Sequence, residues 1–162
     1  YGDELIKKYI LPIINYMQKI HFEITINAPK EKVWDTMLND ATYREWTVPF
    51  EPGSHFEGTW EEGTEIKFLA ADSKGGMYSR IKENRPHEFI SIEHLGMIMD
   101  GVIDTTSDEV KKWTPAFENY TFKEVDGGTQ VLVDMETNEE YKAMFEESWP
   151  KALALLKEIA ER

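Results

Sequence analysis

The sequence has 162 residues, of which 41% are hydrophobic and 30% are charged, and its formal net charge is −13 at pH 7. A chain of this length and composition is expected to fold as one globular domain that buries about two-thirds of its unfolded-chain surface. Because it has 31 acidic and only 18 basic side chains, it would repel phosphate backbones and anionic membrane surfaces, so nucleic acid is excluded as an expected partner.

The chain contains no cysteine, which excludes disulfides, thiol catalysis and cysteine-ligated zinc. No apolar run reaches the roughly 18 residues that a membrane-spanning helix needs. No segment has the charged, apolar and small-residue order of a signal peptide. We therefore expect no membrane insertion and a cytoplasmic location.

Residues 1–16 are interpreted as an amphipathic N-terminal extension to a domain that covers residues 17–162. The apolar residues of this extension recur at helical spacing, and they are Leu5, Ile6, Tyr9, Ile10, Ile13 and Ile14. The run from Met17 makes a natural beginning for the domain, so the extension is interpreted as an addition that need not be native to it. An apolar stripe needs a surface to cover, and we hypothesise that residues 1–16 form a homodimer.

The domain is predicted to begin with a strand and two short helices. From Ile20 to Asn27 apolar and polar residues alternate, which is typical of a strand with one buried face and one solvent-exposed face. Ala28-Pro29 ends this strand, and short helices are predicted over Lys30–Leu38 and Ala41–Trp46. No repeating strand–helix pattern follows, so a parallel sheet with crossovers is not expected.

From residue 55 to residue 136 the chain is predicted to be almost entirely antiparallel strand, with glycine and proline turns between the strands. The predicted strands are His55–Trp60, Thr64–Ala71, Met77–Glu83, Glu88–Met99, Trp113–Val125 and Thr129–Glu136. Glu88–Met99 is predicted to be central because both of its faces are largely apolar. These faces are Ile90, Ile92, His94 and Ile98 on one side, and Phe89, Ser91, Glu93, Leu95 and Met97 on the other. Asp100–Lys112 is interpreted as an acidic loop.

Thr137–Arg162 is predicted to be one long amphipathic helix. Its start is either a capping box of Thr137 with Glu140 or a cap at Asn138. Pro150 has no amide hydrogen for the carbonyl four residues earlier, so we predict a kink near residues 146–150.

The wide apolar stripe of this helix needs a large partner surface, which the strands supply. The predicted fold class is therefore α+β, with a curved antiparallel sheet wrapped around the long C-terminal helix. Such an arrangement leaves a cleft between the helix and the sheet.

Six local strings look like parts of one known family. They are Ile26-Asn27-Ala28-Pro29-Lys30-Glu31-Lys32-Val33-Trp34, Tyr43-Arg44-Glu45-Trp46, Gly58-Thr59-Trp60-Glu61-Glu62-Gly63, Pro86-His87-Glu88-Phe89-Ile90-Ser91-Ile92, Gly127-Gly128-Thr129 and Trp149-Pro150-Lys151-Ala152-Leu153. Over Ile20–Arg162 the chain resembles the START-like, Bet v 1-like (SRPBCC) superfamily. It looks more closely like the bacterial branch related to the C-terminal domain of the activator of Hsp90 ATPase. Ser148 departs from the glycine that is common before the helix tryptophan.

The resemblance implies a helix-grip fold, which agrees with the order of elements predicted from the residues. It does not imply one ligand, because the superfamily uses this scaffold for lipid carriage, polyketide aromatisation, hormone sensing and chaperone stimulation.

No metal and no cofactor are expected. The four histidines, His21, His55, His87 and His94, lie on separate predicted elements, and no two of them have the spacing of a ligand pair. The sequence also has no nucleophile motif, phosphate loop or dinucleotide fingerprint, since its glycine pairs lie in hairpins.

His94 is the strongest candidate for a polar group in the cleft. Strand alternation places it on the face of Ile90 and Ile92, where a histidine can orient a ligand or transfer a proton. The alternative is a hydrogen-bonded histidine at a strand end with no chemical role. Further polar candidates are Tyr78, Arg80, Glu118, Tyr120 and Asp134.

The residues predicted to line a ligand pocket are mainly aromatic residues and methionine, which suit a permissive apolar site. They are Trp34, Phe68, Ile92, His94, Met97, Tyr120, Phe122, Met135, Phe145 and Trp149. The alternative is that these side chains simply fill the core.

The leading functional hypothesis is the binding of a hydrophobic or amphipathic small molecule in the cleft. One alternative is a cyclase- or hydrolase-like enzyme that uses His94 with a tyrosine or a carboxylate, which requires polar groups that converge within hydrogen-bonding distance. A further alternative, which the resemblance suggests, is a stimulator that interacts with a chaperone.

Overall fold

The computed structural model describes residues 17–162, so the predicted extension at residues 1–16 and its homodimer hypothesis lie outside the described residues. The elements in chain order are β1 (Gln18–Ile26), α3 (Lys30–Leu38), α4 (Asp40–Trp46), β2 (His55–Gly58), β3 (Glu65–Leu69), β4 (Gly76–Arg85), β5 (Phe89–Met99), β6 (Val102–Asp104), α5 (Asp108–Lys111), β7 (Ala116–Val125), β8 (Gly128–Thr137) and α6 (Glu139–Ala160).

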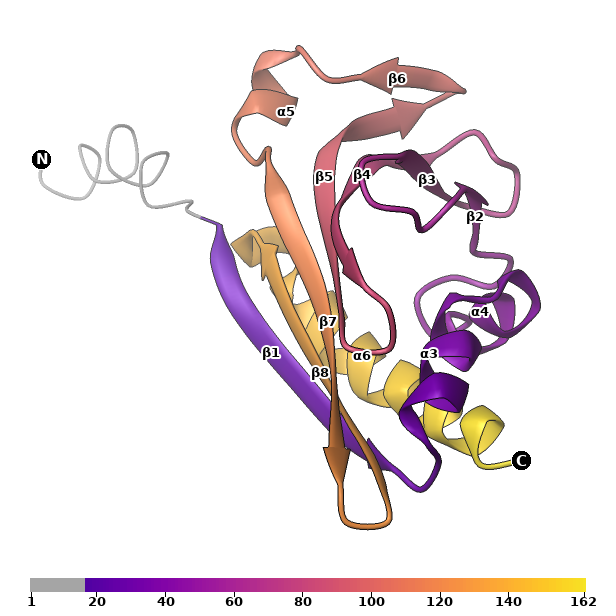
Figure 1. The fold of residues 1–162 in the computed structure, drawn as a ribbon. Helices are drawn as coiled ribbons and strands as arrows, with labels where there is room; N and C mark the ends of the chain where they lie inside the picture. The colour runs from indigo at the N-terminus through magenta and orange to yellow at the C-terminus, as the bar shows by residue number, and fades with distance from the viewer. Residues whose placement is uncertain (1–16) are drawn as a thin grey trace, which may run out of the picture.

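The strands form one antiparallel sheet in the order β1-β8-β7-β5-β4-β3-β2, and β6 pairs with the end of β5. Figure 1 shows α6 along one face of the curved sheet, with α3 and α4 beside its C-terminal half. The predicted α+β class is confirmed, as are the antiparallel sheet around a long C-terminal helix and the two short helices after the first strand.

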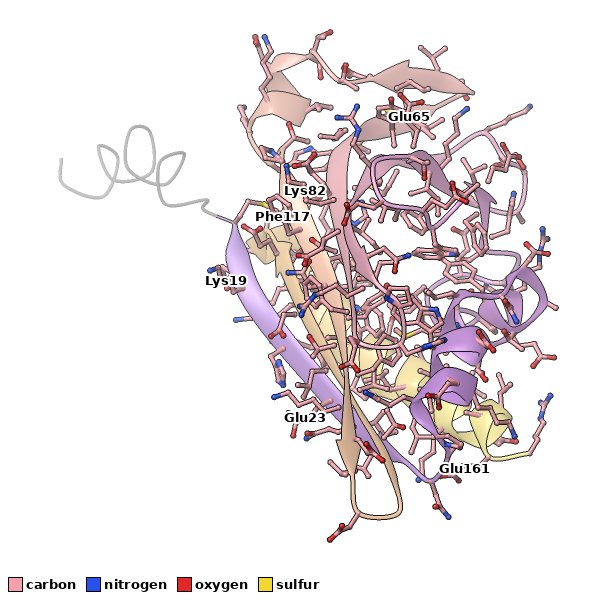
Figure 2. All side chains as sticks on the ribbon, in the orientation of Figure 1. Lys19, Glu23, Glu65, Lys82, Phe117 and Glu161 are labelled. Carbon is pink, nitrogen blue, oxygen red and sulfur yellow. The ribbon has the colours of Figure 1, made fainter. Side chains whose placement is uncertain are left out.

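β1 has the alternating burial that its sequence predicts. From Lys19 onwards its polar residues are exposed and the apolar residues between them are partly buried, until Ile26 is fully buried at the end of the strand. Figure 2 shows Lys19 and Glu23 projecting from the exposed side. The strand starts two residues earlier than predicted, because Gln18 pairs with Thr137 at the end of β8.

The exposed side of β1 places His21 between two carboxylates. His21 Nδ1 lies 2.6 Å from Asp134 Oδ1, and His21 Nε2 lies 2.7 Å from Glu23 Oε2. The hydrogen bonds to Glu23 and then Asp134 favour the imidazolium, so they raise the pKa of His21 above its ordinary value of 6.5.

This raised pKa predicts a small dependence of stability on pH. The stabilisation is fully present below the ordinary pKa and is lost as the pH rises through the folded-state pKa. The difference in free energy of unfolding between the wild-type protein and His21→Gln is expected to fall by about 0.2–1 kcal/mol between about pH 6 and about pH 9. The change is small because His21 and its two carboxylate partners are exposed. Urea unfolding at several pH values measures this difference, and a rise with pH would contradict the prediction.

α3 and α4 close one end of the sheet. α3 has the predicted bounds, and α4 begins one residue earlier than predicted. Two indoles satisfy carbonyls near the end of α3: Trp46 Nε1 donates to Met37 O at 3.0 Å, and Trp60 Nε1 donates to Leu38 O at 2.9 Å. The first hydrogen bond joins α4 to α3, and the second joins α3 to the connection between β2 and β3.

α6 begins at the second of the two predicted caps. Asn138 Oδ1 accepts a hydrogen bond from the Tyr141 amide at 3.1 Å. The helix continues on both sides of Pro150, and the kink near residues 146–150 stays a prediction. Neither α6 nor any other helix within residues 17–162 combines the length and the apolar character needed to cross a membrane.

The segment predicted as a loop over Asp100–Lys112 contains two short elements, β6 and α5. Asp100 and Gly101 both have positive φ values, 51° and 77°, and they reverse the chain so that β6 pairs with the end of β5. Ser107 then caps α5 by accepting from the Val110 amide. Elements of three and four residues are too short for hydrophobic periodicity to reveal them.

A hydrophobic core of buried side chains lies between α6 and the sheet. Fully or almost fully buried members of this core include Val33, Met37, Ile81, Ile90, Leu153 and Leu156. They come from α3, β4, β5 and α6, so one core joins the helices to the sheet.

Candidate functional site

Four polar side chains form one hydrogen-bonded array on the side of the sheet that faces α6. We call Ser79, His94, Glu118 and Tyr120 the polar array. Ser79 Oγ lies 2.7 Å from His94 Nδ1, His94 Nε2 lies 3.1 Å from Glu118 Oε1, and the Tyr120 hydroxyl donates to Glu118 Oε2. The array crosses the three adjacent strands β4, β5 and β7.

Sheet register brings these residues together. Ser79 pairs directly with His94, and the next pairs on the same face join Ile92 to Glu118 and Ile90 to Tyr120. The predicted placement of His94 on the face of Ile90 and Ile92 is therefore confirmed.

The direction of each hydrogen bond follows from the groups involved. With a neutral His94, Nε2–H donates to the Glu118 carboxylate and Nδ1 accepts from the Ser79 hydroxyl. Burial, followed by the charge of Glu118, raises the pKa of Tyr120 well above its ordinary value. Tyr120 therefore remains a hydroxyl donor at neutral pH.

Access to the array is greatest at Glu118, the member that accepts from both His94 and Tyr120. Ser79 and Tyr120 are 0% and 2% exposed, whereas the side chains of His94 and Glu118 are 10% and 17% exposed. A molecule that approaches the array therefore meets Glu118 before the other members.

A partly exposed apolar rim lies beside the array. The Phe68 ring packs edge-to-face against the His94 ring at a centroid distance of 5.9 Å. Phe68 pairs directly with Met77, and Met77 pairs directly with Met97, so the three side chains share one face of the sheet. All three are partly exposed.

The position of Met97 corrects the predicted faces of β5. Tyr78 pairs with Gly96 and Ser79 pairs with His94, which leaves Leu95 as an extra residue in a β-bulge. The bulge reverses the alternation after Leu95, so Met97 shares the face of His94. The prediction that these two residues lie on opposite faces was wrong.

Other predicted pocket residues lie deeper in the core. Trp34, Phe122, Ile92, Met135 and Trp149 are buried, and Phe145 is partly exposed. Trp34 packs edge-to-face on Phe122 at 5.1 Å, and Trp149 Nε1 donates to Met135 Sδ at 3.1 Å. The structure thus separates the ten predicted residues into a packed interior, a partly exposed rim and two members of the polar array.

Of the further polar candidates, Glu118 and Tyr120 belong to the array and Asp134 does not. Asp134 contacts His21 on the exposed side of β1 and β8. Arg80 follows Ser79 on β4 and so lies on the opposite face. Sequence reasoning did not single out Ser79, because only the pairing of β4 with β5 brings this ordinary strand serine to His94.

Two other kinds of site receive no support from the described part of the chain. Within residues 17–162, no three histidine, aspartate or glutamate side chains are grouped closely enough to hold a metal ion. A surface hollow of about 260 Å³ lies by the β3–β4 turn and the end of β5. Its lining includes the exposed turn residues Asp72 and Lys74, and it does not reach the polar array.

The fold defines a class of protein. A curved antiparallel sheet grips a C-terminal helix, which is the helix-grip fold of the START-like, Bet v 1-like superfamily. A family model described as activator of Hsp90 ATPase homolog 1-like protein matches residues 27–161, so the chain belongs to this family. The resemblance inferred from the sequence is confirmed.

Solved structures share this fold at low sequence identity. The Aha1 dimer from Colwellia psychrerythraea has a TM-score of 0.68 and 19% identity, with 90% of this chain and 97% of that chain covered. A protein from Chromobacterium violaceum has a TM-score of 0.65 and 20% identity, with coverage of 89% and 97%. A protein from Mesorhizobium loti has a TM-score of 0.67 and 13% identity, with coverage of 88% and 96%. Among curated proteins, no sequence matches this chain.

Proposed function

We propose that the protein binds a hydrophobic or amphipathic small molecule between α6 and the sheet, beside Glu118, the most exposed member of the polar array. The observation that supports this most is the polar array itself, which lies beside the partly exposed side chains of Phe68, Met77 and Met97. Small-molecule sites combine mainly apolar walls with a few fixed polar groups in the same way.

Stability alone gives little reason to retain such an array. The polar array removes a carboxylate and an imidazole from most of their water, and replacing all partners of a buried polar contact by apolar groups of similar shape is often nearly neutral for stability. Polar groups that are held in place despite this cost suit a role in ligand recognition.

A ligand of the proposed kind is expected to raise the melting temperature. At a free concentration of 100 times its Kd it stabilises the folded state by about 2.7 kcal/mol, which corresponds to about 5–10 °C for a domain of this size. A panel of lipids and aromatic compounds, measured by thermal shift and tryptophan fluorescence, tests this expectation. The proposal fails if no compound in a broad panel shifts either signal.

A matched pair of methionine variants locates the binding site. Met97→Gln puts a polar amide into the apolar rim and is expected to weaken binding about tenfold, because one methionine contributes roughly 1.5–3 kcal/mol when buried. Met99→Gln is the control, since Met99 lies on the same strand and is 63% exposed. Equal affinities of the two variants would place the ligand elsewhere.

Catalysis is the second candidate function, because the array has the hydrogen-bonding order of a serine, a histidine and a carboxylate. Ser79 is fully buried, so a substrate carbonyl has no path to its oxygen and a hydrolase that uses it as nucleophile is not supported. Proton transfer by His94 and Glu118, as in a cyclase, is the form that the accessible groups support. Mass spectrometry of a bound panel compound tests this, since an unchanged ligand indicates binding alone.

Two partner proposals rest on the relatives. One relative is described as a dimer, and we retain a homodimer through residues 1–16 as a proposal for this chain. Sedimentation of the chain with and without these residues tests it, and identical masses would count against it.

Chaperone stimulation rests on the family description, and the ATPase rate of an Hsp90-type chaperone with and without this protein tests it.

A further inference from the structure

Glu118 determines what the polar array offers to a ligand. A carboxylate has about four acceptor positions on its two oxygens and no donor when it is ionised. His94 uses one position on Oε1 and Tyr120 uses one on Oε2, so each oxygen retains a position for another donor. Since the Glu118 side chain is the most exposed of the four, these positions are the accessible ones.

Each donor hydrogen of the array is used in a hydrogen bond to another member of the array. Tyr120 and His94 donate to Glu118, and Ser79 donates to His94 Nδ1. A ligand therefore meets an acceptor and not a donor.

An anionic head group is disfavoured at this position. It would approach the Glu118 carboxylate beside apolar side chains, where charges are screened less than in water. The neighbours of Glu118 in the sheet register are Met135 and Ile92, which cannot compensate an anion. The formal net charge of −13 adds a repulsion in the same direction.

We infer that the ligand presents a hydrogen-bond donor, a hydroxyl or an amine on an otherwise apolar body, to the carboxylate of Glu118, and that the site discriminates against carboxylate ligands. This inference rests on the proposed function, and it names the class of head group that the same site recognises.

Two matched probe series test the inference by calorimetry or tryptophan fluorescence. The aromatic series is para-phenylphenol, para-methoxybiphenyl and biphenyl-para-carboxylate, and the alkyl series is decanol, decyl methyl ether and undecanoate. Each series keeps one apolar body and changes the head from donor to acceptor to anion. The alcohol or phenol is expected to bind about tenfold or more tightly than its ether, since the hydrogen bond is made to a charged group, and the carboxylate is expected to bind most weakly.

A variant pair assigns this preference to Glu118. In Glu118→Gln the side chain has one carbonyl for the two internal donors and gains an amide donor of its own, so the affinity ratio of alcohol to ether should fall towards one. Glu124→Gln removes the same charge from an exposed position on β7 and should leave the ratio unchanged.

The possible outcomes separate this inference from the proposed function. Equal wild-type affinities for the alcohol, ether and carboxylate of a series would overturn the inference and leave binding intact. A preference that survives in Glu118→Gln would also overturn it. If none of the six probes binds the wild-type protein, the proposed function fails together with the inference.

Discussion

Replacing Trp149 by alanine is expected to lower the free energy of unfolding by about 3–5 kcal/mol, the range for removal of a large aromatic side chain from a packed core. Trp149 is 2% exposed, and its ring lies 4.9 Å from the Phe50 ring and 5.8 Å from the Trp46 ring. It also packs against Tyr120 at 6.0 Å. The substitution would therefore open a cavity where α6, α4 and the sheet meet.

The melting temperature should fall by about 6–20 °C, which follows from this range for a domain of this size. Met144→Ala is the control on the same helix, because Met144 is 40% exposed and its truncation should change the free energy of unfolding by about 0.5 kcal/mol or less. If Trp149→Ala had as small an effect as the control, the close packing of α6 on the sheet would be contradicted.

The long periodic elements of this fold could be predicted from the sequence. Alternation identified β1, and helical spacing identified α3 and α6 within a few residues of their observed bounds. These patterns repeat over at least nine residues, so a single exception does not hide them. β6 and α5 were not predicted, because each spans little more than one period of its pattern, which is too short for a repeat to be recognised.

The candidate site was harder to predict because it depends on register. Strand alternation placed His94 on the correct face, but it could not place Met97 beyond the bulge at Leu95. The contact of Ser79 with His94 and that of His94 with Glu118 join strands through pairings that no local pattern specifies. A single sequence therefore indicates which residues can contribute chemistry, and the pairing of strands decides which of them meet.

Replacing only Glu118 by methionine is expected to destabilise the protein by about 2–4 kcal/mol, because it leaves the donors of His94 and Tyr120 without an acceptor in nearly buried positions. The combined variant Ser79→Ala, His94→Leu, Glu118→Met and Tyr120→Phe removes donors and acceptors together. It leaves no orphaned polar group, so its free energy of unfolding is expected to lie within about 1 kcal/mol of the wild-type value or above it.

Urea unfolding of the wild-type protein, the single variant and the combined variant measures this order of stabilities. If the combined variant is stable but no longer distinguishes an alcohol from its ether, the array is retained for recognition and not for folding. If the combined variant is instead as unstable as Glu118→Met, the array contributes to folding in its own right. Its presence among apolar side chains would then need no ligand to explain it, and the main support for the proposed function would be lost.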